Sequence, residues 1–142
     1  MKLSPLEEYG LRCLLQLARR PDDQPVTIRT IAEGEGLSTA YVGKLMFLLQ
    51  RAQLVNSTRG VQGGYLLAKA PQELTLAEVF HALEPDDLED VCGKFTGNEA
   101  ACVHNSACAI KSVWHGLQNH MNDYLNKVTL RDLAGPGAKV AA

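Results

Sequence analysis

The sequence contains no apolar run approaching the roughly 18 residues that a membrane helix requires, so no membrane association is expected. Its opening, MKLSPLEEYG, is not expected to be a signal peptide, because acids and a proline occupy the place where an apolar segment should lie. These absences predict a cytoplasmic protein, and cytoplasmic thiols stay reduced. The 4 cysteines are therefore interpreted as a metal or reactive site, or as small buried residues, before disulfides. A length of 142 residues suits one domain, with or without an appendage.

Acidic residues are also missing from one long internal segment. No Asp or Glu lies between Gly36 and Gln72, although the chain has 16 acids and a net charge of -2. Residues 1–70 carry nine Lys and Arg against six acids, whereas residues 71–142 carry five against ten. A polyanion such as nucleic-acid phosphate favours an acid-free, basic segment. The alternative explanation for the missing acids is chance, combined with the apolar residues that a core requires.

The chain opens with a helix signal. Ser4 and Glu7 form a capping box around Pro5, which suits the first helical position. Apolar residues recur at helical spacing from there, and the helix is predicted to end near Arg20. Cys13 lies on its apolar stripe, so we expect a small buried residue rather than a ligand.

Two short helices with a tight turn between them follow. Thr27 begins one, the sequence GEG ends it, and Ser38 begins the other, which extends to about Gln53 with Val42, Leu45, Met46 and Leu49 on one face. This is the helix-turn-helix pattern, whose second helix enters the major groove of DNA. An ordinary helical hairpin is the alternative. The residues that the second helix presents away from its apolar face are Ser38, Thr39, Ala40, Tyr41 and Lys44.

A glycine-rich hairpin comes next, in the stretch STRGVQGGYLLAKAP at residues 57–71. Two strand-like runs flank RGVQGG, and a β-hairpin directly after a helix-turn-helix is the wing of a winged helix. Arg59 lies at its tip beside Gly60, and an arginine there can enter a minor groove, where A·T tracts concentrate negative potential. A solvated surface arginine is the alternative.

The second half begins with a capping box at Thr75. Residues 84–108 then form an acidic segment without periodicity, interpreted as a long loop, which holds Cys92, Cys102 and Cys108. The Cys-x9-Cys-x5-Cys spacing differs from the tight pairs of a zinc ribbon, whereas thiolates suit both iron–sulfur clusters and zinc. A surface loop that merely contains cysteines is the alternative.

A long amphipathic helix is predicted from about Ser106. Its apolar stripe consists of Ile110, Val113, Trp114, Leu117, Met121, Tyr124, Leu125 and Val128. Such a stripe needs a partner surface. A second chain is favoured over packing on its own domain, because the winged-helix core is small and operator half-sites require two-fold symmetry. The tail from Gly135 is predicted to be disordered.

Catalysis is not expected. Cys102 and His104 have the chemistry of a nucleophile and a base, but they are near neighbours in one loop without an oxyanion scaffold. The other histidines lie in helical segments without a ligand pattern.

The segments MKLSPLEEYGLRCLLQLA, IRTIAEGEGLSTAYVGKLMFLLQRAQLV and STRGVQGGYLLAKAP together resemble the bacterial Rrf-two type regulators, a family that includes IscR, NsrR and RirA. The resemblance implies a mainly α-helical winged helix-turn-helix with a two-stranded wing and a long C-terminal dimerisation helix. It implies a homodimer that binds a double-stranded DNA operator as a repressor. The chain then divides into a DNA-binding domain at 1–83, a cluster-binding loop at 84–108, a dimerisation helix and C-terminal segment at 109–134, and a tail at 135–142.

The resemblance also implies a [2Fe–2S] or [4Fe–4S] cluster held by Cys92, Cys102 and Cys108. Glu8 of the partner subunit is the fourth ligand that the resemblance implies. The sequence also offers His104, inside the cysteine loop, as the second candidate, and an exogenous or solvent ligand is the third. The expected function is a regulator whose DNA affinity depends on a cluster that senses redox state, nitric oxide or iron. A zinc-bound or metal-free thiol switch of the same fold is the other interpretation.

Family members contact DNA at the positions of the wing residue Arg59 and of Ser38, Ala40 and Tyr41. The sequence departs from the family at Gly43, where members often carry a longer polar side chain. It departs again at Lys111, where IscR has a histidine ligand. These departures bear on the operator sequence and on the fourth ligand.

Overall fold

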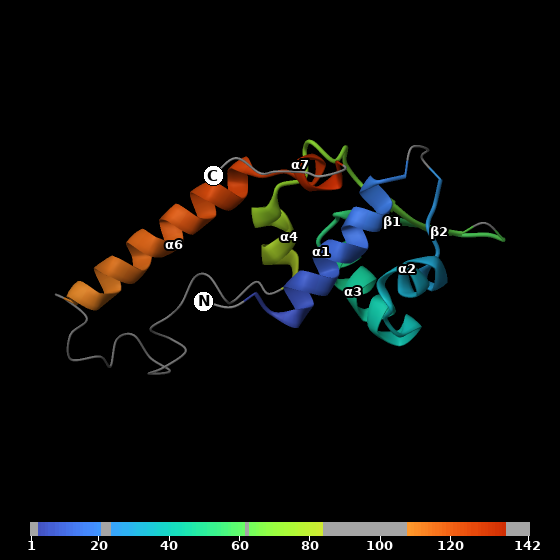
Figure 1. Ribbon diagram of the computed structural model, residues 1–142, viewed down its shortest axis with the longest axis horizontal. Helices are drawn as coiled ribbons and strands as arrows, with labels where there is room; N and C mark the ends of the chain where they lie inside the picture. Colours follow the sequence, from blue (N-terminus) through green and yellow to red (C-terminus); the bar gives the residue numbers. More distant parts are fainter. Residues whose placement is uncertain (1–2, 21–23, 62, 84–107, 136–142) are drawn as a thin grey trace.

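The computed structural model describes residues 3–20, 24–61, 63–83 and 108–135. The described helices are α1 (Pro5–Ala18), α2 (Ile28–Glu35), α3 (Thr39–Arg51), α4 (Leu76–Leu83), α6 (Ala109–Lys127) and α7 (Leu130–Ala134), and the strands are β1 (Val55–Thr58) and β2 (Gly64–Leu67). Figure 1 shows α6 projecting from one end of the molecule and the β1–β2 hairpin from the opposite end. The predicted mainly helical fold with a two-stranded wing is confirmed. No helix in the described part of the chain combines the length and hydropathy needed to span a bilayer.

The first three helices begin at the caps that the sequence predicts. Ser4, Thr27 and Ser38 each accept a hydrogen bond from the backbone N–H three residues on, at 3.2, 3.1 and 3.2 Å. Each bond satisfies one of the N–H groups that a helix start leaves unpaired. Helix α1 ends at Ala18 and α3 at Arg51, each two residues before its predicted end.

The turn between α2 and α3 depends on Gly36. This residue closes α2 with φ 67°, in the left-handed region that favours glycine. The next residue, Leu37, donates its N–H to the carbonyl of Ala32 at 3.0 Å, which reverses the chain toward α3. The second glycine of the sequence GEG therefore sets the angle between the two helices.

The wing is anchored at its base to the chain that precedes α2. Strands β1 and β2 pair antiparallel in the register Val55↔Leu67, Asn56↔Leu66, Ser57↔Tyr65 and Thr58↔Gly64. Val26 and Tyr65 exchange two backbone hydrogen bonds, at 2.9 and 2.8 Å. This bridge fixes the hairpin relative to the helix-turn-helix.

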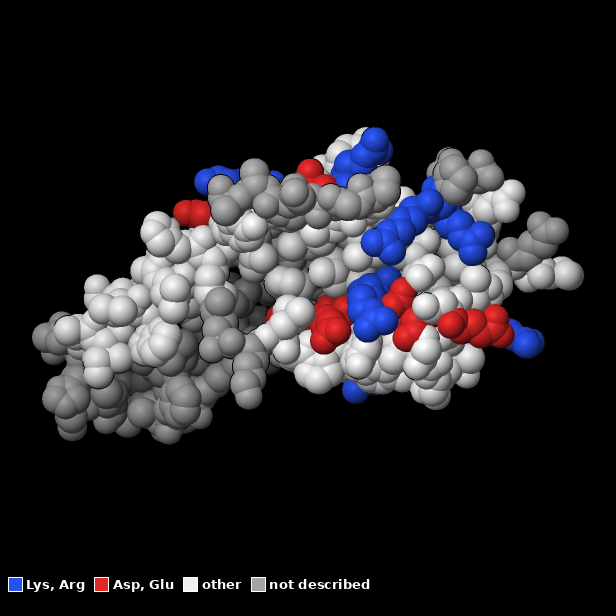
Figure 2. Space-filling view, viewed as in Figure 1, with Lys and Arg blue, Asp and Glu red and all other residues white. Residues whose placement is uncertain are grey.

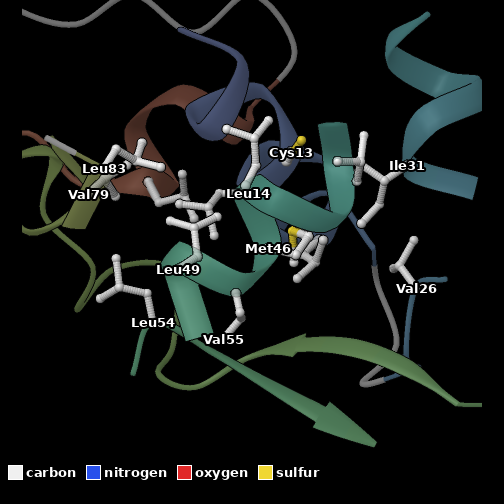
Figure 3. Close-up of a cluster of buried hydrophobic side chains, with 14 of the residues drawn as sticks. Cys13, Leu14, Val26, Ile31, Met46, Leu49, Leu54, Val55, Val79 and Leu83 are labelled. Atoms are coloured by element: carbon white, nitrogen blue, oxygen red, sulfur yellow. The ribbon is translucent and has the colours of Figure 1, made fainter. Parts of the chain in front are cut away.

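The inner face of α3 packs into the hydrophobic core. Val42, Leu45, Met46 and Leu49 are fully buried, as the sequence predicts. In Figure 3, side chains of α1, α2 and α4, among them Leu14, Ile31 and Val79, lie around the α3 residues Met46 and Leu49. Burial of each such side chain stabilises the fold by about 1.5–3 kcal/mol. Helix α3 is therefore held firmly with its opposite face outward.

The chain after α6 departs from the prediction. The sequence places Val128 on the stripe of the long helix, but α6 ends at Lys127 and Val128 is extended and buried. Backbone hydrogen bonds from Leu76 to Val128 and from Leu130 to Leu74, at 2.9 and 2.8 Å, return the chain to the core. Leu130 is fully buried there. The C-terminal segment thus contributes to the same core as the helix-turn-helix. Of the tail predicted to be disordered at 135–142, the structure describes Gly135, which follows α7, and residues 136–142 lie outside the described ranges.

Candidate nucleic-acid interface and metal ligands

Helix α3 presents a continuous outer stripe. The predicted DNA-contacting residues Thr39, Ala40 and Lys44 are exposed on it. The sequence reasoning missed Phe47 and Arg51, which are also exposed. At about 100° per residue, both lie within about 20° of Ala40 around the helix axis. The angular positions of the residues around the helix axis would therefore have identified Phe47 and Arg51.

Two of the predicted DNA-contacting residues have structural roles as well. The hydroxyl of Ser38 caps α3. The Tyr41 ring is half-buried and meets Tyr9 of α1 edge to face, with ring centroids 6.0 Å apart and an interplanar angle of 81°. Tyr41 therefore lies partly against α1, whereas the prediction places it away from the apolar face of its helix.

The wing tip is shaped by its glycines. Arg59 is exposed, and Gly60 has φ 121°, which side-chain-bearing residues rarely adopt. The N–H of Gly63 donates to the carbonyl of Gly60 at 2.9 Å, and a Cβ on Gly63 would lie 2.6 Å from the carbonyl oxygen of Thr58. The tip therefore presents Arg59 on a compact turn that other residues would disrupt.

An ion pair joins the end of the wing to α4. The Lys69 ammonium lies 2.8 Å from the carboxylate of Glu78, which also completes the predicted capping box with Thr75. The hydrogen bond from Lys69, helped by the bonds from Thr75, lowers the pKa of Glu78 below its usual range. Glu78, which lies beyond the acid-free segment, thus links a lysine of the wing to the start of α4.

Opposite charges alternate on another face of the molecule. Figure 2 shows acidic and basic side chains side by side over the region that α1 and α2 occupy in Figure 1. Pairs such as Arg29 and Glu33, 2.8 Å apart, neutralise one another there. In the acid-free segment that contains α3 and the wing, Lys69 pairs with Glu78, whereas the ion pairs of the described residues include none for Lys44, Arg51 or Arg59. These three cations remain available to an anionic partner.

Glu8, the predicted fourth ligand, begins a chain of contacts that leads to the helix-turn-helix. Its side chain is 51% exposed, and its carboxylate lies 3.7 Å from the guanidinium of Arg12. The Arg12 Nε donates at 2.7 Å to Glu35, a side chain only 9% exposed at the end of α2. This bond, more than any other contact, raises the pKa of Arg12.

Arg12 also contacts the aromatic pair beside α3. Its guanidinium lies 5.4 Å from the ring centroid of Tyr9, which in turn meets Tyr41. Sequence spacing would have found the Glu8–Arg12 pair, one helical turn apart, but not the bond to Glu35, which lies 23 residues further on.

Cys108 is the one predicted cysteine ligand within the described residues. It caps α6, and its Sγ accepts the backbone N–H of Lys111 at 3.4 Å. The predicted ligands Cys92, Cys102 and His104 lie outside the described residues. Within the described ranges, no group of three or more His, Cys, Asp or Glu side chains is placed to hold a metal ion.

Cys13 has the structural role that the sequence predicts. It is fully buried in the core on α1. Burial raises the pKa of its thiol to about 12, and the negative charge of Glu35 adds to this effect. A thiol that stays protonated is a poor nucleophile and a poor metal ligand.

These features define a winged helix-turn-helix protein of the kind found among transcriptional regulators. A sequence model of the Rrf2 family, iron-dependent transcriptional regulators, matches residues 3–136. The chain therefore belongs to the Rrf2 family, and the resemblance stated from the sequence is confirmed.

Individual relatives agree with this assignment. The chain is 34% identical to the protein rrf2 of Nitratidesulfovibrio vulgaris over 133 residues, which cover 94% of this chain and 87% of that protein. It is 30% identical to the regulator IscR of Pectobacterium carotovorum, over 94% of this chain and 79% of that one. Transcriptional regulation is therefore the shared function.

Solved structures share the fold over nearly the whole length. CymR, the global cysteine regulator of B. subtilis, superimposes with a TM-score of 0.77 at 28% identity, covering 94% of this chain and 96% of that one. IscR of T. potens gives a TM-score of 0.75 at 30% identity, covering 100% and 93%. Two differently named types of regulator thus share this architecture.

Proposed function

We propose that the protein is a homodimeric, cytoplasmic repressor that binds operator DNA with an affinity set by an iron–sulfur cluster. The observation that carries the cluster proposal is Cys108 at the N-terminus of α6, in a family whose model is named for iron dependence. DNA recognition is assigned to the outer face of α3 and to the wing.

Two parts of the molecule, the outer face of α3 and the wing, would contact DNA. Lys44 and the other exposed residues of α3 would lie in a major groove, and Arg59 in the adjacent minor groove. The bridge between Val26 and Tyr65 supports this assignment, because it holds the wing at a fixed position beside α2. A rigid spacing between the two reading elements suits two successive grooves of one duplex.

The exposed stripe of α6 supports a dimer. This helix packs against α4 yet has no buried residue, and Val113 is 70% exposed. Its other exposed apolar residues are Ile110, Trp114, Leu117 and Tyr124. A single helix with this much exposed apolar surface needs a second apolar surface to cover it. Pairing with the same helix of a second chain would also supply the two-fold symmetry that paired half-sites require.

The described ligands fit a cluster that is shared between two chains. Cys108 lies at the N-terminus of α6, where its Sγ accepts the backbone N–H of Lys111. In Figure 1 the start of α6 lies at one end of the molecule, away from the first turn of α1 that carries Glu8. A site containing both residues therefore requires the partner subunit to supply one of them. When bound, an iron–sulfur cluster supplies a centre that oxidation, nitrosylation or iron shortage can alter.

The contacts around Arg12 provide a route from this site to the DNA-reading helix. When Glu8 is engaged by a metal site, its carboxylate no longer attracts Arg12 to the same extent. Arg12 then depends more strongly on Glu35 and on the face of Tyr9, which contacts Tyr41. The occupancy of Glu8 would thereby bias the positions of α2 and α3.

The proposed route predicts the effect of Glu35→Gln. This substitution removes the charge that holds Arg12, so the affinities of the cluster-loaded and cluster-free forms for DNA should move closer together. Glu33→Gln is the matched control, because Glu33 is on the same helix but forms an exposed pair with Arg29. A ratio of the two affinities that is unchanged in Glu35→Gln would remove this route from the mechanism.

Purification without oxygen tests the cluster itself. We expect visible absorption together with iron and acid-labile sulfide, all of which Cys108→Ala should reduce. A colourless protein with equimolar zinc, or without metal, would contradict the proposal. It would support the alternative of a zinc-bound or metal-free thiol-switch regulator of the same fold.

A further inference from the structure

The outer stripe of α3 is unusual in its chemistry. Ala40 and Gly43 offer almost no side chain. Lys44 follows, and Phe47, one turn beyond Gly43, is 56% exposed. This exposure places Phe47 outside the core, whereas its chain neighbour Met46 is completely buried. The stripe therefore presents one large apolar ring where a hydrogen-bonding side chain would be expected on a DNA-reading helix.

The surroundings of the ring leave it open to a partner. Gly43 precedes Phe47 by one helical turn, and a Cβ added to Gly43 would have only Ile28 Cδ1 within 4 Å, at 3.9 Å. Glycine inside a helix costs about 1 kcal/mol relative to alanine. Its presence where alanine would fit keeps this side of the ring uncovered and lets the helix backbone approach a surface closely.

The charges around Phe47 indicate which partner covers it. Lys44 lies three residues before it and Arg51 four residues after it, on the same side of the helix. No acid occurs between Gly36 and Gln72. An exposed ring between two cations, in a segment of the chain without acids, suits a surface that combines apolar groups with a high density of negative charge.

The major groove of DNA is such a surface. Phosphates line its edges, and among the four bases only thymine places a methyl group in it. Phe47 has no hydrogen-bond donor or acceptor, but its ring can cover a methyl group. By helical geometry Phe47 lies about 10 Å along the axis from Ala40, so both residues can face one groove about 12 Å wide.

We propose that Phe47 is a specificity-determining residue, which contacts the 5-methyl group of a thymine in the operator. This inference rests on the proposed DNA binding and names one base feature that α3 reads. It predicts an operator in which thymine is preferred at one position of each half-site. Lys44 and Arg51 would flank that position and neutralise phosphates.

Replacement of thymine by uracil tests the proposal, because uracil keeps the hydrogen-bonding edge of thymine and lacks only the methyl group. Random duplex DNA would first be selected for binding to the full-length protein, purified without oxygen. Each thymine of the selected site would then be replaced in turn. We expect one position per half-site at which uracil weakens binding about fourfold, as the loss of one buried methyl group predicts.

Two variants decide whether Phe47 causes this effect. Phe47→Ala should bind thymine and uracil sites equally, whereas Lys44→Ala should bind both more weakly but keep the fourfold difference. The exposure of the ring implies that Phe47→Ala melts at nearly the temperature of the wild-type protein, and Phe47→Leu should retain part of the preference. Failure to select any DNA would overturn the proposed function as well. Selected DNA with no uracil effect, or with the same effect in Phe47→Ala, would overturn this inference alone.

Discussion

Replacing Gly43 with alanine should make the protein more stable. Gly43 lies inside α3 with an ordinary helical backbone, and its added Cβ would meet nothing closer than 3.9 Å. Alanine is favoured over glycine by about 0.8–1 kcal/mol inside a helix. We therefore expect a gain of about 1 kcal/mol, or about 2–5 °C in melting temperature for a chain of this size.

The same substitution at Gly64 should have the opposite effect. A Cβ there would lie 2.6 Å from the carbonyl oxygen of Val26 and 3.0 Å from its nitrogen. Relief of this clash requires Val26 to move away from Tyr65 and to lengthen both hydrogen bonds that anchor the wing. Overpacking of this kind costs about 1–3 kcal/mol. The two variants should therefore differ by about 2–4 kcal/mol in free energy of unfolding.

Urea denaturation followed by circular dichroism measures both values. The variants must be compared at one protein concentration and in one state of cluster loading, since dimerisation and bound metal both add to apparent stability. Gly43→Ala should also bind DNA more weakly, because its methyl group occupies the outer stripe of α3. A destabilised Gly43→Ala, or a Gly64→Ala as stable as wild type, would refute this account of the two glycines.

Four further outcomes are expected. Val113→Asp should shift the protein toward monomer in sedimentation experiments. Asn119→Asp, which changes an exposed residue elsewhere on α6, should leave the dimer intact. A dimeric Val113→Asp would argue against the α6 interface. In cluster-free native protein at pH 8, iodoacetamide should modify Cys108 but not Cys13, as read by mass spectrometry. Because folding raises the pKa of Cys13 from 9.0 to about 12, its contribution to stability is complete below pH 9 and is lost as pH rises toward 12. Arg59→Ala should weaken operator binding roughly 5- to 100-fold without loss of the dimer or of iron, and unchanged binding would exclude the wing.

Local sequence signals predicted most of the helix-turn-helix. Ser4, Thr27 and Ser38 cap helices where their side chains can reach unpaired N–H groups, and the apolar period of α3 identifies its buried face. These features depend on residues within a few positions of one another, so a single sequence contains the information. The glycines of the wing belong to the same category, although the clash of Gly64 with Val26 required coordinates.

Contacts between distant segments were not predictable in this way. The apolar period of α6 continues through Val128, but hydrogen bonds with the chain around Leu76 and Leu74 override it and return Leu130 to the core. Likewise, Glu35 is an ordinary acid in the sequence, and only the packing of α2 on α1 brings it to Arg12. Tyr41 turns partly inward for the same reason, because Tyr9 lies beside it.

The central claim, that an iron–sulfur cluster sets DNA affinity, is tested most directly by one titration. A labelled operator would be titrated with the cluster-loaded protein and with the same preparation after cluster removal, at one salt concentration, with fluorescence anisotropy as the readout. The account predicts dissociation constants that differ by roughly 5- to 150-fold, the usual range for coupling between two sites. Equal dissociation constants for the two forms would contradict it.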